Sequence, residues 1–282
     1  MASTETQVAP THVLELTGES TPINVLLRDL WRQRSLIPML AKKDFQARYR
    51  SAALGVLWSV FLPVIQGAVI AVVFSVIVKV PSGGDNRAVY VMSGIVAWTY
   101  FTSAWGAGST SMVDGGAIAG KVYFPRLIMP AVPALAVFPS FVISTGVVFI
   151  IAAAFSVPFH LTLLWIPAAM LMTVTISIEL SAISCLLHVY YRDVRYIVQA
   201  VLTVALYAAP VIYPLEQAHR FQWVLVFGNP MTGPIQIMHL AFLGHATKVG
   251  ESSLVSVGYI FVLGVVTLFA FRRHERTAID RL

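Results

Sequence analysis

The run from Gly115 to Lys121 has the glycine and lysine spacing of a phosphate-binding loop, G-x-x-x-x-G-K-[ST]. Such a loop needs a serine or threonine at the next position, where its hydroxyl holds Mg²⁺, but Val122 stands there. The run also follows an apolar block rather than a buried strand. We therefore expect this chain to bind no cofactor, so that any ATP and Mg²⁺ would be bound by a separate subunit.

The other side chains that could do chemistry are scattered. Glu179 is the only acidic residue inside a long apolar block, where a carboxylate is costly and commonly functional. The alternative is a structural Glu179, protonated or hydrogen-bonded to a neighbouring helix. Cys185 is the single cysteine, so no intrachain disulfide can form. Metal-ligand spacing is absent among His160, His188, His219, His239 and His245. The sequence predicts no catalytic residue, no metal site and no enzyme activity.

The composition identifies the elements that must position these residues. Hydrophobic residues make up 57% of the 282 positions and charged residues only 11%, whereas soluble proteins carry about 25% charged residues. This excludes a soluble enzyme and a disordered chain. Apolar blocks of roughly 20 residues or more can each cross a bilayer. The sequence predicts an all-α polytopic membrane protein with six transmembrane helices, over residues 52–78, 88–112, 127–155, 162–190, 195–213 and 253–271.

The basic residues predict the orientation of these helices. The net charge is +6, and most of the 19 Lys and Arg residues fall in segments that share one side of a six-span arrangement. These are 28–50, Lys121 with Arg126, a turn containing Arg192, Asp193 and Arg195, and the basic tail 272–282. By the positive-inside rule, both termini are cytosolic. Topology accounts for the charge, so we predict no nucleic-acid partner.

The membrane domain predicted over 51–271 is preceded by two cytosolic segments. Residues 1–22 contain no Lys or Arg and many Ser and Thr residues, which predicts a disordered tail. In residues 23–50, Leu27, Leu30 and Trp31 recur at helical spacing among basic residues. This pattern favours an amphipathic helix at the membrane interface. The alternative is a solvated basic linker.

Residues 214–250 form a second segment that is not predicted to span the membrane. They are too apolar for an aqueous loop and are interrupted by Gly228, Pro230, Gly233 and Pro234. Irregular backbone at membrane depth is tolerated where protein or a water-filled cavity covers it. We predict a re-entrant helical hairpin between the fifth and sixth spans, dipping in from the outside.

Aromatic residues inside the predicted spans suggest a substrate path. Trp98, Phe101 and Trp105 stand at i, i+3 and i+7 and share one helix face. A rise of about 1.5 Å per residue puts Trp98 roughly 15 Å deep in its span. Tyr207 and Tyr213 lie on the fifth span, with Pro210 between them. These side chains either pack the core or line a path for a bulky amphipathic substrate, and sugar rings stack well on such faces.

Four segments, taken together, resemble the membrane subunit of type-2 ABC exporters, in the branch that exports O-antigen, teichoic acid and other lipid-linked polysaccharides. Their order and spacing match over roughly residues 25–280. The first joins Lys43, Asp44, Arg48, Tyr49 and Arg50 to Leu54-Gly55-Val-Leu-Trp58. The second comprises Lys121, Tyr123, Phe124, Pro125 and Arg126. The third is Tyr191-Arg192-Asp193-Val194 leading to Pro210-Val-Ile-Tyr213-Pro214, and the fourth is Asn229-Pro230-Met231.

The resemblance implies a homodimer in the bacterial cytoplasmic membrane, with two copies of a separate ABC ATPase subunit. It implies that the segment from Lys121 to Arg126 couples to the ATPase, and that the segment from Lys43 to Arg50 forms the surface helix and the entry to the first span. The implied substrate is a polyprenyl-pyrophosphate-linked polysaccharide, such as an O-antigen, a galactan or a teichoic-acid-like polymer, moved across the membrane.

Three other functions are alternatives to the export of a lipid-linked polysaccharide. An exporter of small lipophilic drugs or lipids would share the family. A proton-coupled carrier is disfavoured by the single intramembrane acid and by the lack of an obvious internal repeat. A membrane-bound transferase is disfavoured because clustered acids and a nucleophile–base pair are absent. Co-purification with a soluble ATPase would separate the exporters from the carrier and the transferase.

Overall fold

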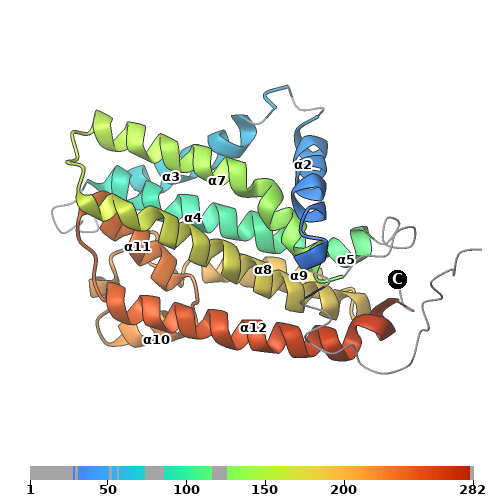
Figure 1. Cartoon of the computed structure of the whole chain (residues 1–282). Helices are drawn as coiled ribbons and strands as arrows, with labels where there is room; N and C mark the ends of the chain where they lie inside the picture. The colour runs from blue at the N-terminus through green and yellow to red at the C-terminus, as the bar shows by residue number, and fades with distance from the viewer. Residues whose placement is uncertain are drawn as a thin grey trace, which may run out of the picture.

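The computed structural model describes residue 28 and the ranges 31–50, 53–55, 57–73, 86–115 and 126–279. Within these ranges every regular element is a helix, and no strand occurs (Figure 1). The predicted tail 1–22 lies outside the described residues, as do positions 121–125. The helices in chain order are α2 (Leu36–Tyr49), α3 (Leu57–Val72), α4 (Arg87–Gly108), α5 (Ser111–Asp114), α7 (Ile128–Ala154), η2 (Leu161–Trp165), α8 (Ile166–Tyr190), α9 (Val194–Ala205), η3 (Leu215–Phe221), α10 (Gln222–Gly228), α11 (Thr232–Leu243) and α12 (Val249–Ile279).

Three helices in the described ranges are long and apolar enough to cross a membrane. They are Ile128–Ala154, Leu161–Tyr190 and Val249–Arg273. These bounds agree closely with the third, fourth and sixth predicted spans. Helix α12 continues to Ile279, so the tail predicted from residue 272 begins as helix. Pro133 and Pro139 lie inside α7, as membrane helices tolerate when their neighbours satisfy the freed backbone groups.

Helix α4 is the centre of the bundle. It has 22 residues, and most of its side chains are buried around its whole circumference. Helices α3, α7, α8 and α11 all pack against it. The Asn86 side chain caps its first turn by accepting hydrogen bonds from the backbone N–H groups of Ala88 and Val89. Side chains on α4 can therefore reach every neighbouring helix.

Helix α9 is shorter than the fifth predicted span. It ends at Ala205 after 12 residues, about 18 Å at the usual rise per residue, whereas the prediction extended to residue 213. Pro210 and Pro214 account for the difference, because proline lacks a backbone N–H and the residue before it disfavours helical dihedrals. Residues 206–214 follow an irregular path. Helix α3 accounts for the middle of the first predicted span, and residues 74–85 lie outside the described ranges.

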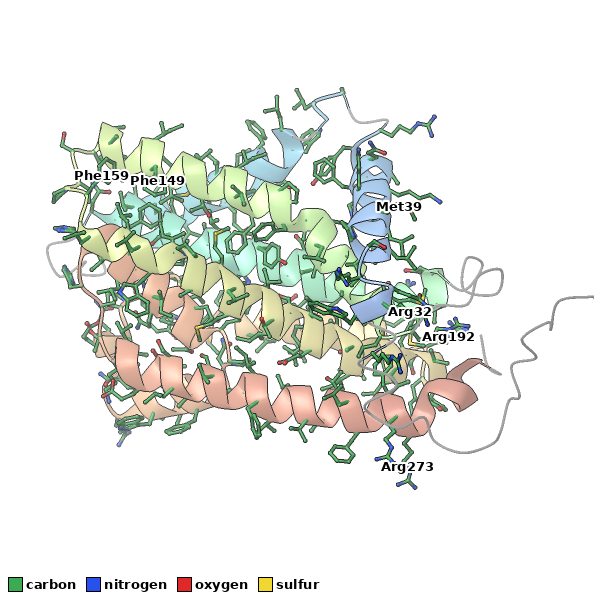
Figure 2. The ribbon with its side chains drawn as sticks, viewed as in Figure 1. Arg32, Met39, Phe149, Phe159, Arg192 and Arg273 are labelled. Atoms are coloured by element: carbon green, nitrogen blue, oxygen red, sulfur yellow. The ribbon has the colours of Figure 1, made fainter. Side chains whose placement is uncertain are left out.

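Helix α2 lies across the long helices near one end of the bundle (Figure 1). Ile37, Leu40, Ala41 and Phe45 share one face of α2 and are buried or partly buried, and α2 packs on α7. Of the predicted apolar stripe, Leu27 and Leu30 lie outside the described residues and Trp31 is 69% exposed. Figure 2 shows Arg32, Arg192 and Arg273 at the end of the bundle near α2, and Phe149 and Phe159 at the opposite end.

The segment predicted as a broken hairpin folds into η3, α10 and α11. Helices α10 and α11 are joined at Asn229–Met231, where the sequence places a proline. Helix α11 has 12 residues, nearly all buried, and it packs against α4, α8 and α12. Ser256 of α12 donates a hydrogen bond to the Pro230 carbonyl (2.8 Å) and accepts one from the Gly233 N–H (3.2 Å). Helix α11 is therefore held inside the bundle, whereas α10 lies at its surface, with Val226 as its one buried residue.

Candidate functional site

A pocket of about 390 Å³ lies between α3, α4 and α9. Most of its lining side chains carry an amide or a hydroxyl group, although the helices that contribute them are mainly apolar. Trp98 and Leu202 are part of the wall. The polar lining residues are Gln66, Thr102, Ser103, Gln199, Thr203 and Tyr207. The arrangement can form hydrogen bonds with a polar, uncharged solute.

The polar face of α9 follows from its sequence. Gln199 and Thr203 stand four residues apart on α9, so they point to the same side, and Tyr207 follows just after the helix ends and lines the same pocket. All three are exposed, as is Gln66 of α3. An amide facing hydrocarbon has no hydrogen-bond partner there and is costly. This side of the molecule therefore requires a polar cover, either water or another polypeptide.

The three aromatic residues predicted to share one face of α4 do not all border the pocket. The rings of Trp98 and Phe101 have centroids 5.3 Å apart, and those of Phe101 and Trp105 5.4 Å apart. Trp98 and Phe101 are each 2% exposed and pack in the core, and of the two only Trp98 also borders the pocket. Trp105 Nε1 donates a hydrogen bond to Ser184 Oγ of α8 at 2.9 Å. The common face predicted for the three residues is present, but it places Trp98 alone at the pocket.

Tyr207 and Tyr213 belong to the irregular segment after α9. Tyr207 lines the pocket and is 68% exposed. Tyr213 is partly buried, and its hydroxyl donates a hydrogen bond to the Tyr207 carbonyl at 3.0 Å. Tyr213 therefore supports the backbone that presents Tyr207.

Two buried residues of α4, not foreseen from the sequence, fix this irregular segment. Arg87 Nη2 donates a hydrogen bond to the Ile212 carbonyl at 2.8 Å. The Tyr90 hydroxyl lies 3.2 Å from the Pro210 carbonyl and 3.1 Å from the Tyr213 carbonyl. Backbone carbonyls left without helix partners after α9 are thus held by side chains of α4, as buried polar groups require.

The contribution of the Tyr90 hydroxyl to holding the irregular segment can be measured at position 207. We expect Tyr90→Phe to raise the thiol-labelling rate of a cysteine introduced at position 207, because the segment loses one anchor. The variant keeps the ring that stacks on His239 at 3.9 Å, and a lost hydrogen bond costs about 1 kcal/mol.

The matched control is Tyr100→Phe. This tyrosine is also on α4, stacks on Phe141 and donates a hydrogen bond to the Ala134 carbonyl at 2.9 Å, away from the irregular segment. It should lower stability similarly but leave labelling at position 207 unchanged. Equal labelling rates in the two variants would contradict the role of Tyr90.

Glu179 lies apart from the pocket. It is on α8 and faces α12, where a Cβ added at Gly264 would lie 3.1 Å from its Oε1. Its Oε2 is buried and has no hydrogen-bond partner among the described residues. A glycine at this point of α12 therefore makes room for the carboxyl group between the two helices.

The residues predicted to form the surface helix and the cytosolic turn lie on or next to α2 and α8, whereas most of the segment predicted to couple to the ATPase is not described. Lys121, Tyr123, Phe124 and Pro125 lie outside the described residues, while Arg126 is partly buried just before α7. Asp44 and Arg48 form an ion pair of 2.9 Å one turn apart on α2. Lys43, in the middle of α2, is exposed, and Tyr49 at its end is partly buried. Arg50, Arg192 and Asp193 are exposed next to the ends of α2 and α8.

Asn229 links the predicted hairpin to α9. Its Oδ1 accepts a hydrogen bond from the Met231 N–H (3.0 Å), which shapes the turn at Pro230, and its Nδ2 donates to the Ala205 carbonyl (3.4 Å) at the end of α9. Tyr259 of α12 donates a hydrogen bond to the Phe227 carbonyl. The turn is therefore positioned by both α9 and α12.

These features describe an integral membrane protein with a polar pocket against its central helix. In the described part of the chain no cluster of His, Cys, Asp or Glu could hold a metal ion. Residues 35–243 match the ABC-2 type transporter family, and the chain belongs to this family. The resemblance drawn from the four sequence segments is thus confirmed.

Proteins named O-antigen export system permease protein RfbA are similar to the chain over most of its length. The one from Myxococcus xanthus is 26% identical over 256 residues, which cover 89% of this chain and 97% of the relative. One from Klebsiella pneumoniae is 24% identical over 242 residues, covering 84% and 91%. A second from Klebsiella pneumoniae is 24% identical over 202 residues, covering 71% and 77%.

Proposed function

We propose that the chain is the permease subunit of an ATP-driven exporter, which moves a polyprenyl-pyrophosphate-linked polysaccharide from the inner to the outer leaflet of the bacterial cytoplasmic membrane. The family supports a transport function, and the names of the relatives support a polysaccharide. The observation that carries the proposal is the pocket at the side of α4, which is lined by amides, hydroxyls and the exposed ring of Tyr207. Sugars present hydroxyls at the ring edge and apolar faces that stack on aromatic rings.

The same pocket supports a homodimer. The amides of Gln66 and Gln199 face outward from α3 and α9, and in a bilayer these two groups would be left without hydrogen-bond partners. A second copy placed against the same surface would enclose the two pockets as one polar path. This pairing would be isologous, with the same patch used on both subunits, as in most homodimers.

The proposed topology has six membrane segments with both termini in the cytosol. The basic side chains near α2 would lie at the inner leaflet, and α2 would lie along the interface. The α10–α11 pair would form a re-entrant hairpin from the outer side, since α11 has only 12 residues and is covered by protein. The segment from Lys121 to Arg126 would then meet the ATPase, whose two copies bind the ATP and Mg²⁺.

The pocket favours a glycan over the alternatives. A lipophilic drug would be matched by an apolar cavity with few polar groups, whereas the polar lining here includes two glutamines and three hydroxyl residues besides Tyr207. A proton-coupled carrier would need a relay of acids. Glu179 does not line the pocket and lies between α8 and α12, and this position favours the structural alternative for it.

Depletion of the protein from its own cells tests this function. We expect a lipid-linked glycan to accumulate on the cytosolic side, and the tagged permease to co-purify with a soluble ATPase. Reduced efflux of lipophilic dyes, without any accumulated glycan, would instead indicate the drug exporter. A matched control is re-expression of the intact chain, which should clear the accumulated glycan.

A further inference from the structure

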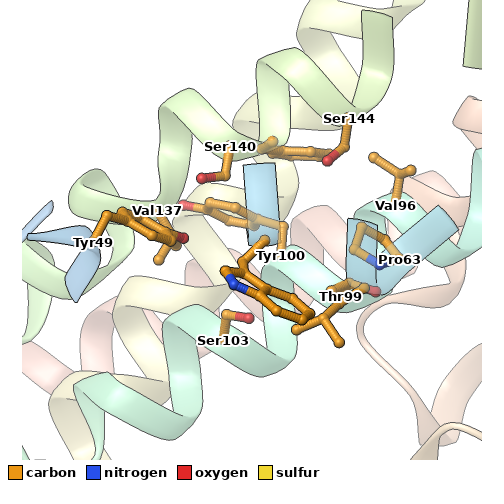
Figure 3. A pocket seen from close by; sticks show the side chains of 12 residues that line it. Tyr49, Pro63, Val96, Thr99, Tyr100, Ser103, Val137, Ser140 and Ser144 are labelled. Atoms are coloured by element: carbon orange, nitrogen blue, oxygen red, sulfur yellow. The ribbon is translucent and has the colours of Figure 1, made fainter. Parts of the chain in front are cut away.

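A second pocket, of about 170 Å³, lies between α3, α4 and α7 (Figure 3). Thr99 and Ser103 of α4 line it, as do Ser140 and Ser144 of α7, and Tyr49 and Tyr100 add aromatic rings. None of the described residues that line it is charged. The pocket therefore combines several hydroxyl groups with apolar side chains, and its described lining carries no charge.

Two of its hydroxyl groups have no hydrogen-bond partner. Serine and threonine in helices ordinarily satisfy their hydroxyls by bonding back to the carbonyl three or four residues earlier, as Thr145 does to Phe141 on α7 at 2.9 Å. Ser140 is 8% exposed, and its Oγ makes no such bond within the described part of the chain. The Oγ1 of Thr99 is likewise buried and without a partner there. Buried polar groups in native proteins are normally satisfied, so this pair calls for a ligand.

The lining determines what kind of ligand fits. Hydroxyls both donate and accept hydrogen bonds and suit the edge of a sugar ring, while Tyr49, Tyr100 and Trp58 offer faces or edges for its apolar side. An anionic phosphate would find no cation among these lining residues. Ser103 also lines the larger pocket against α9, so the two spaces adjoin at this residue.

We propose that the pocket between α3, α4 and α7 binds an uncharged sugar ring, with the hydroxyls of Thr99 and Ser140 as its hydrogen-bond partners. The inference rests on the proposed function as a glycan exporter and adds a binding site beside the path. The ring belongs either to the exported lipid-linked glycan or to a neutral glycolipid of the membrane. Trp58, at the start of α3, is 41% exposed and marks the lipid-facing side from which such a molecule enters.

The test compares two lipids that differ only in the sugar. The full-length permease is purified and exposed to glucosyl-diacylglycerol or to diacylglycerol with the same acyl chains, and the retained lipid is counted by native mass spectrometry. We expect the glucosyl lipid to be retained at least roughly tenfold better, because the analogue without hydroxyls leaves the site's polar groups unpaired. Equal retention of the two lipids, as expected for a pocket that holds only water, would overturn the proposal.

Substitutions in the pocket test whether the preference for the glucosyl lipid arises there. Thr99→Val with Ser140→Ala should abolish the preference without lowering the thermal stability, because the hydroxyls removed have no partner. Thr145→Val removes a buried hydroxyl from α7 that does not line the pocket, and it should retain the preference. Ser140→Ala alone provides a milder variant that should weaken the preference. A preference that survives the double substitution would overturn the assignment.

A competition experiment distinguishes the two possible sources of the sugar ring. Displacement of the glucosyl lipid by a polyprenyl-pyrophosphate-linked hexose assigns the pocket to the exported glycan, while retention against this competitor assigns it to a membrane glycolipid. Either result supports a sugar site. Lipid retention is measured without ATP or export, so a failure of this site can be distinguished from a failure of the proposed transport function.

Discussion

Phe101→Ala is expected to unfold the protein at markedly lower temperature, whereas Tyr207→Ala is expected to leave its stability unchanged and to impair export. Phe101 is 2% exposed and lies between the rings of Trp98 and Trp105. Removing a buried aromatic side chain costs roughly 3–5 kcal/mol, because a cavity remains. Tyr207 is 68% exposed at the pocket, so its ring supports little of the fold.

The export defect of Tyr207→Ala follows from lost stacking. The nearest measured analogue, a nucleic-acid base on an aromatic ring, contributes about 1–3 kcal/mol, and 1.4 kcal/mol is about tenfold. We expect glycan transport at limiting substrate to fall by roughly fivefold or more, with normal yield and normal ATPase binding. Thermal unfolding and transport into vesicles, measured on both variants, give the result. Parallel loss of stability and transport in Tyr207→Ala would remove this residue from the path.

Gly233→Ala is expected to disrupt the packing of α11 against α12. A Cβ at position 233 would lie 2.3 Å from Ser256 Oγ and 2.7 Å from the Ser252 carbonyl oxygen. The serine hydroxyl can rotate, but the carbonyl belongs to the backbone of α12 and cannot move alone. Overpacking of this kind costs about 1–3 kcal/mol, and the hydrogen bonds of Ser256 to Pro230 and Gly233 would be lost as well.

The matched control for this substitution is Gly228→Ala, five positions earlier at the end of α10. A Cβ there meets no atom within 4 Å, so stability should change by less than about 1 kcal/mol. The measurement is thermal unfolding in lipid nanodiscs, followed by ATPase co-purification. If Gly233→Ala is as stable as Gly228→Ala, the close contact between α11 and α12 is not present in the protein.

The sequence predicted the long helices best. The blocks at 127–155, 162–190 and 253–271 are long and predominantly apolar, and their helices are found nearly where expected. The fifth span was predicted too long because its apolar run continues past Ala205 to Tyr213, although Pro210 already argued for an earlier end. Apolar composition alone does not distinguish helix from irregular backbone that is buried by protein.

The candidate site was predicted only in part. Trp98 and Tyr207 were identified as path residues from their depth and type, and both line one pocket. Gln199 and Thr203 were missed, although their spacing of eight and four residues from Tyr207 within an apolar block was a usable signal. Arg87 and Tyr90 could not have been found, because their partners are backbone carbonyls more than 100 positions away in the chain.

Labelling of a single cysteine at position 203 tests most directly whether the polar face of α9 lines a water-filled path. Thr203 is exposed on that face, and the native Cys185 is buried, so Thr203→Cys provides one accessible thiol. We expect a charged, membrane-impermeant thiol reagent to modify this cysteine in the assembled exporter during ATP turnover, and the lipid-linked glycan to protect it. Modification only by a lipid-soluble reagent, with no protection by the glycan, would show instead that this face contacts lipid and does not line a path.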